Sequence, residues 1–176
     1  MPDEVRRPAL SEEDRPADDQ ATAKQLDKAM VPPTAHPVAD LFPMFTADEL
    51  SELAEDLAGR GLLQPIVLDG EGRVLDGRNR LTACNIAGVE PTFATYEGDD
   101  PDGYALAVNG QRRDMAKMPK AMVAARSLLV TNTSQSAAAK AIGVSQSLMA
   151  KAVVVLNHLP ELVDCAVEAG MEHRHQ

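Results

Sequence analysis

Two arginines stand where the sequence changes from an apolar strand pattern to a helical one. The segment 74–84, VLDGRNRLTAC, places Arg78 and Arg80 directly after a glycine. The first turn of a helix has unpaired N–H donors and the positive end of the helix dipole, so a cation there is unfavourable by about 0.3–1 kcal/mol. A bound anion such as a phosphate would reverse the sign of this effect. The spacing therefore suggests phosphate binding, and pairing of the arginines with carboxylates such as Asp76 or Glu97 is the alternative.

A second candidate site lies in the segment 135–156, QSAAAKAIGVSQSLMAKAVVVL. Ala139 is small enough for two helices to cross closely, Gly143 supplies a turn, and Val144 begins a second apolar stretch. This spacing is typical of a helix-turn-helix, whose second helix meets base edges in the major groove of DNA. An ordinary helical hairpin with an alanine-rich contact is the alternative. The candidate DNA-contacting residues are polar residues at the starts of the two helices and a lysine one turn further on: Ser134, Gln135, Ser145, Gln146, Ser147 and Lys151.

Charge is distributed unevenly between these two segments. The whole chain of 176 residues has a formal net charge of −10. Residues 36–110 carry fourteen Asp or Glu and four Arg, whereas residues 111–158 carry seven Lys or Arg and one Asp. A negative net charge opposes indiscriminate nucleic-acid binding, but the basic part predicts a working surface for an acidic partner. Solvated lysines on a helical region are the alternative interpretation.

The elements that must position these residues follow from apolar periodicity and turn residues. Thr46 and Glu49 match a capping box that opens a helix with Leu50, Leu53, Ala54 and Leu57 on one face. We expect a short strand in 36–42, two strands joined by a glycine turn in 65–77, a helix at 78–87 that stops at Gly88, and a strand in 91–97. Beyond residue 97 the pattern predicts only helices, at 101–109, 119–130, 134–142, 146–157 and 160–169.

These elements predict an α+β fold with two parts. A small mixed-sheet domain at 36–115 is followed by an all-α domain at 116–170, with a disordered acidic arm at 1–35 and a tail at 171–176. No apolar run is long enough to span a bilayer, and the N-terminus lacks a signal-peptide stretch. Cys84 and Cys165 lie far apart in sequence that reads as helix, so a disulfide framework is not expected. The natural compartment is therefore the cytoplasm.

The segment 61–84, GLLQPIVLDGEGRVLDGRNRLTAC, resembles the N-terminal domain of the ParB/sulfiredoxin superfamily. In that family a Pro-Ile strand, a hairpin and a Gly-x-x-Arg turn lead into a helix whose N-terminus holds nucleotide phosphates. The segment 109–115, NGQRRDM, is similar to the family's third motif, and the helix-turn-helix follows as in ParB-type partition proteins. The resemblance covers about residues 36–170. It implies a nucleotide site made of Gln64, Pro65 and Ile66 at the base and sugar, of Gly77, Arg78, Asn79 and Arg80 at the phosphates, and of Asn109 and Arg112 closing over the triphosphate.

The resemblance implies a DNA-binding protein of plasmid, phage or chromosome partition, or of transcriptional regulation, associated with the nucleoid or a plasmid. The implied cofactor is CTP or another nucleoside triphosphate with Mg. The implied partners are double-stranded DNA, a partition ATPase and a second copy of the chain in a homodimer, with no membrane. ParB proteins usually carry a C-terminal dimerisation domain, whereas only six residues follow Gly170 here.

Two departures from the family pattern bear on catalysis. Val108 stands where the family has a metal-binding Glu, so we expect no metal site of the protein and at most a weak NTPase or nuclease. Cys84 lies beyond the phosphate turn, so sulfiredoxin chemistry is not expected. Two other functions stay open. A nuclease or NTPase would need the acidic residues Asp76, Glu97, Asp99 and Asp100 to converge at the turn, and a regulatory adaptor would bind a protein partner without nucleotide.

Overall fold

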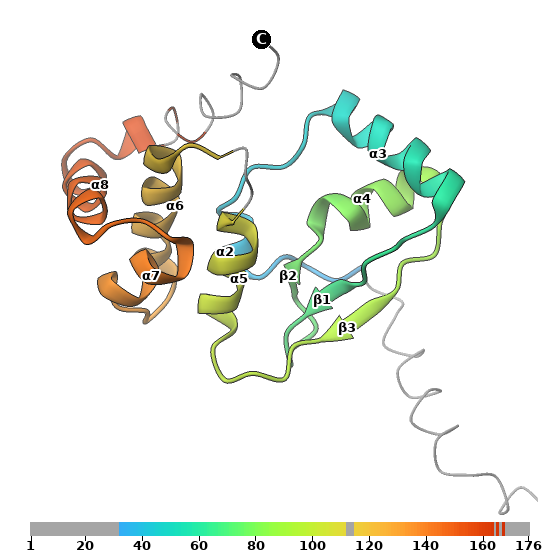
Figure 1. Cartoon of the computed structure of the whole chain (residues 1–176), viewed down its shortest axis with the longest axis horizontal. Coiled ribbons are helices and arrows are strands. Elements are labelled where there is room, and N and C mark those ends of the chain that lie inside the picture. Colours follow the sequence, from blue (N-terminus) through green and yellow to red (C-terminus); the bar gives the residue numbers. More distant parts are fainter. Residues whose placement is uncertain (1–31, 112–114, 164, 166, 168–176) are drawn as a thin grey trace, which may run out of the picture. The chain divides into compact units, whose positions relative to one another are not determined.

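The computed structural model describes residues 32–111, 115–163, 165 and 167, so the predictions for the N-terminal arm, for Arg112 and for the tail fall outside it. The described elements, labelled in Figure 1, are α2 (Pro37–Asp40), α3 (Ala47–Arg60), β1 (Ile66–Leu68), β2 (Val74–Asp76), α4 (Arg78–Ala87), β3 (Phe93–Thr95), α5 (Pro101–Gly110), α6 (Lys117–Val130), α7 (Gln135–Ile142) and α8 (Gln146–His158). Strands occur only before residue 97 in this part of the chain, and the predicted α+β class is confirmed.

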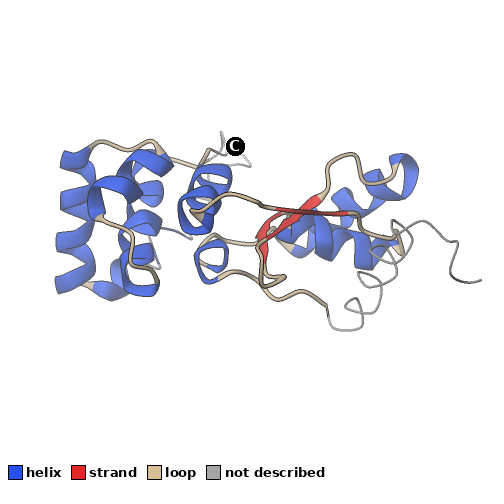
Figure 2. Ribbon diagram, turned by 90° about the horizontal axis from the view of Figure 1, so that it is seen from below, coloured by secondary structure: helices blue, strands red, loops and turns tan. Residues whose placement is uncertain are grey.

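The three strands, red in Figure 2, form one mixed sheet. Their order in the sheet is β2-β1-β3. Strand β1 pairs antiparallel with β2 and parallel with β3. An isolated bridge between Ala35 and Val74 extends the pairing on the outer side of β2. There the N–H of His36 donates to the Val74 carbonyl at 3.0 Å, and the N–H of Val74 donates to the Thr34 carbonyl at 2.8 Å. The outer edge of β2 is therefore partly covered, whereas β3 is the other edge strand.

Asp69 fixes the turn between β1 and β2. Its carboxylate accepts the backbone N–H of Glu71 at 2.9 Å, the backbone N–H of Arg73 at 2.8 Å and the Nε–H of Arg73 at 2.7 Å. Burial alone would raise the pKa of Asp69, but the hydrogen bonds from Arg73 and Glu71 outweigh it and hold this pKa below its ordinary value. The hairpin that leads into α4 is thus held by one ionised carboxylate.

The prediction of a strand at 36–42 is wrong, because residues Pro37–Asp40 form the short helix α2. Pro37 occupies the first turn, where its missing N–H costs nothing and its fixed φ suits a helix. His36 caps the helix, since its Nδ1 accepts the backbone N–H of Val38 at 3.3 Å. Val38 and Ala39 are fully buried. Of the residues next to this helix, Ala35 is the one that pairs with a strand, through its bridge to Val74.

Two hydrophobic clusters stabilise the described elements. The smaller one joins α3 to α4 through Ala54, Leu57, Ala83 and Cys84. The capping box of α3 is present as predicted, with Thr46 and Glu49 each accepting a backbone N–H of the other. The larger cluster runs from α2 and β2 through α5 to the helices that follow; its largest fully buried members include Val38, Leu75, Leu106, Val123, Met149 and Val163. The sheet and the helical segment therefore share one core.

Helix α5 packs against both β2 and α7. The Asn109 amide donates to the carbonyl of Leu75 in β2 at 2.9 Å and to the carbonyl of Ala105 at 2.8 Å. Gly110 ends the helix where Ile142 approaches closely, because a Cβ built on Gly110 would lie 2.2 Å from the Ile142 Cγ1. These two neighbouring residues therefore tie α5 to the sheet on one side and to α7 on the other.

Candidate functional site

The turn between β2 and α4 requires glycine. Gly77 has a φ of +97°, a conformation that L side chains rarely adopt. A Cβ at this position would lie 3.1 Å from Arg80 Nη2, 3.2 Å from the Ile66 Cγ1 and 3.3 Å from the Ile66 Cα. Ile66 is fully buried beneath the turn, so it supports the turn and cannot line a base or sugar as the sequence predicted. No side-chain hydrogen bond caps the N-terminus of α4, which begins directly after Gly77.

Arg80 lies at this turn and donates through one terminal nitrogen of its guanidinium. Its Nη2 donates to the Asp76 carboxylate at 3.0 Å and to the Pro65 carbonyl at 3.2 Å. Carboxylate pairing, the alternative drawn from the sequence, is thus confirmed for Arg80 with Asp76. Within the described part of the chain, however, the buried Nε of Arg80 has no hydrogen-bond partner. A buried guanidinium N–H without an acceptor is unfavourable, and a phosphate oxygen is an acceptor suited to it.

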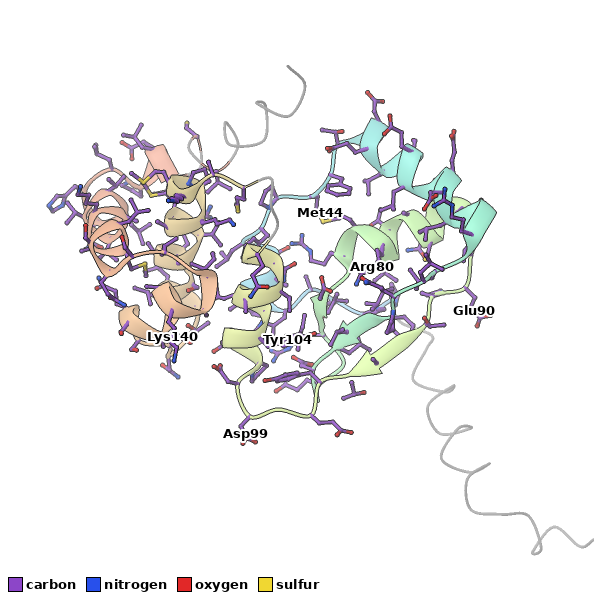
Figure 3. All side chains as sticks on the ribbon, viewed as in Figure 1. Met44, Arg80, Glu90, Asp99, Tyr104 and Lys140 are labelled. Carbon is purple, nitrogen blue, oxygen red and sulfur yellow. The ribbon has the colours of Figure 1, made fainter. Side chains whose placement is uncertain are left out.

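Helix α5 brings an aromatic side chain towards the same charges. The rings of Tyr104 and Tyr96 stack with centroids 4.4 Å apart. Burial raises the pKa of the Tyr104 hydroxyl, the Asp76 carboxylate and Tyr96 raise it further, and Arg80 opposes them. Figure 3 shows Tyr104 on α5 and Arg80 on α4. The sequence analysis missed Tyr104; the signal was that the chain has only two tyrosines, on either side of one acidic loop.

Arg78 and Asn79 direct their side chains away from the turn. The Nη1 of Arg78 donates to the carbonyls of Ala39 and Phe42, the latter at 3.1 Å, and its Nη2 lies 2.9 Å from the Asp40 carboxylate. The carboxylate partner of Arg78 is therefore Asp40 and not Asp76 or Glu97. The Asn79 Oδ1 accepts the backbone N–H of Phe45 at 3.1 Å. Both side chains contact the segment 39–45, so only their backbone remains at the turn between β2 and α4.

The remaining residues of the predicted nucleotide site are placed in different ways. Gln64 and Pro65 are exposed beside the turn. Asn109 is buried with its amide N–H groups engaged by Leu75 and Ala105, so it does not close over the turn with those donors. Arg112 lies outside the described residues. The structure therefore assembles Gly77, Arg80 and exposed Gln64 around the turn, and engages Arg78 and Asn109 in packing.

Two of the four carboxylates considered for catalysis, Asp76 and Asp100, have partners within the fold. Asp76 pairs with Arg80, and Asp100 accepts the backbone N–H of Gly103 at 2.8 Å as the N-cap of α5. Among the described residues no group of three or more His, Cys, Asp or Glu is placed to hold a metal ion. Cys84 is fully buried, and burial raises the pKa of its thiol, as expected for a packing residue. Both cysteines are free.

Helices α7 and α8 have the geometry of a helix-turn-helix. The chain turns by 116° between them over the three residues 143–145, within the range of about 90–120° that is typical of the motif. Gly143 has a φ of +75°, and the N–H of Val144 donates to the Ala139 carbonyl at 2.9 Å, which closes the end of α7. Ala139 is fully buried at the crossing. No single described helix is long and apolar enough to cross a membrane, although this bent pair passes that test together on length and composition.

The predicted DNA-contacting side chains lie at the exposed end of this motif. Ser134 and Ser145 are N-caps, whose hydroxyls accept the N–H groups of Ala137 and Leu148 at 3.2 Å. Ser147 and Lys151 are exposed on α8, and Gln135 is half-buried. The amide of Gln146 reaches back across the turn and donates to Ser136 on α7. Residues 115–158 carry no Asp or Glu; their basic residues are Lys117, Lys120, Arg126, Lys140 and Lys151.

Comparison with known proteins gives relatives of one kind, although no family model matches the chain. The chain is 30% identical over 130 residues to a probable chromosome-partitioning protein ParB from Rickettsia conorii, which covers 72% of this chain and 45% of that protein. It is 25% identical over 153 residues to a nucleoid occlusion protein from Geobacillus thermodenitrificans, which covers 79% of this chain and 54% of that protein. The chain thus spans about half the length of these relatives.

Two crystal structures of a C-terminally truncated ParB from Caulobacter crescentus are similar in part. The complex with the centromeric parS site has a TM-score of 0.46 and 21% identity, with 75% of this chain and 76% of that chain covered. The complex with CTP-gamma-S has a TM-score of 0.35 and 23% identity, with 75% and 82% covered. The sequence similarity extends over 72–79% of the chain. On that similarity, the chain is a homologue of ParB-family proteins over most of its length.

Proposed function

We propose that the chain binds specific sites in double-stranded DNA through α7 and α8, in a partition, nucleoid occlusion or transcription-control system. The observation that carries this proposal is the 116° turn between the two helices, which leaves the capped N-terminus of α8 exposed. A major groove about 12 Å wide admits a helix in this way. Gln146 and Ser147 would then meet base edges, and Lys151, one turn further on, would meet a phosphate or a guanine.

Electrostatics supports the same surface. Residues 115–158 carry five positive charges and no carboxylate, whereas residues 36–110 have a net charge of −10. The phosphate backbone therefore attracts the helical segment and is repelled by the rest of the chain. The similarity to proteins named for chromosome partitioning and nucleoid occlusion agrees with a DNA site on the chromosome.

Selection from a random DNA pool tests this proposal. The chain should enrich one sequence, and its affinity should fall as salt rises. If Lys151 meets a phosphate, Lys151→Ala should weaken binding to all sequences alike and reduce the slope of log affinity against log salt by about 1, because one phosphate contact is lost. Arg60→Ala is the matched control, since Arg60 is an exposed basic residue on α3 paired with Asp56. Failure to enrich any sequence would refute the proposal.

We also propose that the turn at Gly77–Arg80 holds the phosphates of a nucleoside triphosphate with Mg, CTP first among them. Two observations support it: no side chain caps the N-terminus of α4, and the buried Arg80 Nε lacks an acceptor. A phosphate about 4 Å from the guanidinium is worth about 4 kcal/mol at an effective dielectric near 20. The bound nucleotide would supply the anion that makes a cation at a helix N-terminus favourable.

Calorimetry with CTP, ATP, GTP and UTP, each with Mg, separates a ligand site from a structural ion pair. If Arg80 is a phosphate ligand, Arg80→Ala should abolish binding and Asp76→Asn should tighten it, because the carboxylate competes with the phosphate for Nη2. Binding that is unchanged in Arg80→Ala would refute this site. Silence from all four nucleotides would favour the adaptor function. Turnover should be slow, since Val108 cannot ligate a metal ion.

A further inference from the structure

The first residue of the proposed recognition helix has its amide held by the preceding helix. The Nε2 of Gln146 donates to the backbone carbonyl of Ser136 and to the Ser136 Oγ, both at 3.3 Å. Ser136 lies in α7, ten residues earlier in the chain, and the helix-turn-helix brings the two together. Ser136 was not among the residues predicted from the sequence, because nothing in its local pattern points to α8.

This contact fixes which end of the amide faces outward. A backbone carbonyl can only accept, so it must face the amide nitrogen of Gln146 and would repel the amide oxygen. The amide nitrogen has two N–H groups, and the carbonyl and hydroxyl of Ser136 are two acceptors. The donors of Gln146 are therefore engaged within the protein, and its Oε1 remains as the group available to a ligand. Gln146 is an exposed residue, as contact with a ligand requires.

We infer that Gln146, positioned by Ser136, selects a base with an exocyclic amino group at one position of the DNA site. This inference rests on the proposed DNA-binding function. In the major groove only adenine N6 and cytosine N4 offer hydrogen-bond donors, whereas guanine and thymine present acceptors there. An oxygen held outward therefore accepts from adenine or cytosine on the contacted strand and discriminates against guanine and thymine.

The two residues have separable effects on base preference. Gln146→Ala removes the acceptor, so the preference for adenine or cytosine at that position should fall by about three- to tenfold, to no preference. Ser136→Ala removes the hydroxyl but keeps the carbonyl, so one N–H is released while Oε1 still faces outward. A glutamine with an acceptor and a donor both free pairs with adenine at N6 and N7, which cytosine cannot match. Ser136→Ala should therefore narrow the preference to adenine.

The test is selection from a random duplex pool with the full chain and the three variants Gln146→Ala, Ser136→Ala and Ser51→Ala. Ser51 is an exposed helical serine on α3, outside the proposed interface, so its variant controls for loss of a surface hydroxyl. We expect one position that is adenine or cytosine in the wild type and Ser51→Ala, unselective in Gln146→Ala, and adenine in Ser136→Ala. Thermal unfolding of each variant checks that it is folded.

The outcomes separate this inference from the function on which it rests. If the wild type enriches a site but Gln146→Ala alters no position, or the altered position is guanine or thymine, the inference is overturned and DNA binding stands. If Ser136→Ala leaves the preference at that position unchanged, the orienting role of Ser136 is overturned. If the wild type enriches no sequence, the inference and the proposed function are both refuted.

Discussion

Arg78 and Arg80 are two residues apart, yet their side chains have different partners. Replacing each by alanine should therefore distinguish a residue that stabilises the fold from one that binds a ligand. The Arg78 side chain is 18% exposed and joins α4 to the end of α2 through the carbonyls of Ala39 and Phe42. Arg78→Ala would leave the carbonyl of the fully buried Ala39 without this donor. We expect Arg78→Ala to destabilise the fold without abolishing binding at the turn.

The magnitude follows from those contacts. Hydrogen bonds from a charged group contribute about 1.5–3 kcal/mol each, whereas the ion pair of Arg78 with Asp40, whose side chain is 67% exposed, adds at most about 1 kcal/mol. Solvation of the groups left behind offsets part of this sum. The free energy of unfolding should therefore fall by about 2–4 kcal/mol, which lowers Tm by roughly 6–15 °C for a domain of this size.

Thermal and urea unfolding of Arg78→Ala, Arg80→Ala and Arg60→Ala measure the difference. Arg60 is 72% exposed and pairs within its own helix, so its variant should change the free energy of unfolding by less than about 0.5 kcal/mol. Arg80→Ala should cost less stability than Arg78→Ala and should remove nucleotide binding. Equal stability of Arg78→Ala and Arg60→Ala would show that the contacts to α2 contribute nothing, and the reasoning would be wrong.

Three further predictions concern single residues in the same region. Gly77→Ala should lower the free energy of unfolding by about 2–4 kcal/mol in urea titration, because a positive φ and the contact with Ile66 both oppose a Cβ. Asp69→Asn should lower the free energy of unfolding by about 1–3 kcal/mol, since the turn loses charged hydrogen bonds. Because the pKa of Asp69 is lowered in the fold, this contribution should be present at neutral pH and disappear as acid protonates the carboxylate. Unfolding measured at pH 7 and at pH 3 checks this. Burial and the Arg73 charge lower the pKa of His36, and the charges of Asp102, Asp69 and Glu71 oppose this shift. As pH falls below 6.5, the unfolded chain therefore binds a proton at His36 before the folded chain does, and the free energy of unfolding should fall. His36→Asn replaces the Nδ1 acceptor of the α2 cap by an amide oxygen that does not titrate, so the stability of this variant should depend less on pH between 7 and 5. Identical pH profiles for the two proteins would contradict this role.

Much of the fold could be predicted because its signals are local. The capping box at Thr46 and the glycine at 143 each act within one turn of helix, so neighbouring residues suffice to identify them. The segment 36–42 misled the prediction because its apolar residues fit a strand as well as a helix. A histidine in the N-cap position is not among the strongly preferred capping residues, so the start of α2 was missed.

The candidate sites could be located from the sequence, but the roles of their side chains could not. A glycine before a helix marks a turn, and this identified Gly77. The partners of Arg78 lie 36–39 residues away, so no local spacing distinguishes it from Arg80. The contact between Gln146 and Ser136 likewise exists only once two helices cross. Local patterns predict the position of a residue within a helix, strand or turn, whereas tertiary contacts determine which groups its side chain touches.

The close approach of α5 to α7 limits how this protein can be rebuilt. Ile142 occupies space that exists only because residue 110 lacks a Cβ, so the two positions must be exchanged together. A chimera that replaces residue 115 onward by the helices of another protein would keep Gly110. The residue at the position of Ile142 in those helices would then have to fit against Gly110. Conversely, this motif moved onto another scaffold would meet a Cβ wherever that scaffold lacks the glycine. The helical segment from α6 to α8 is therefore not an independent module, and its junction with α5 is the place where engineered hybrids should succeed or fail.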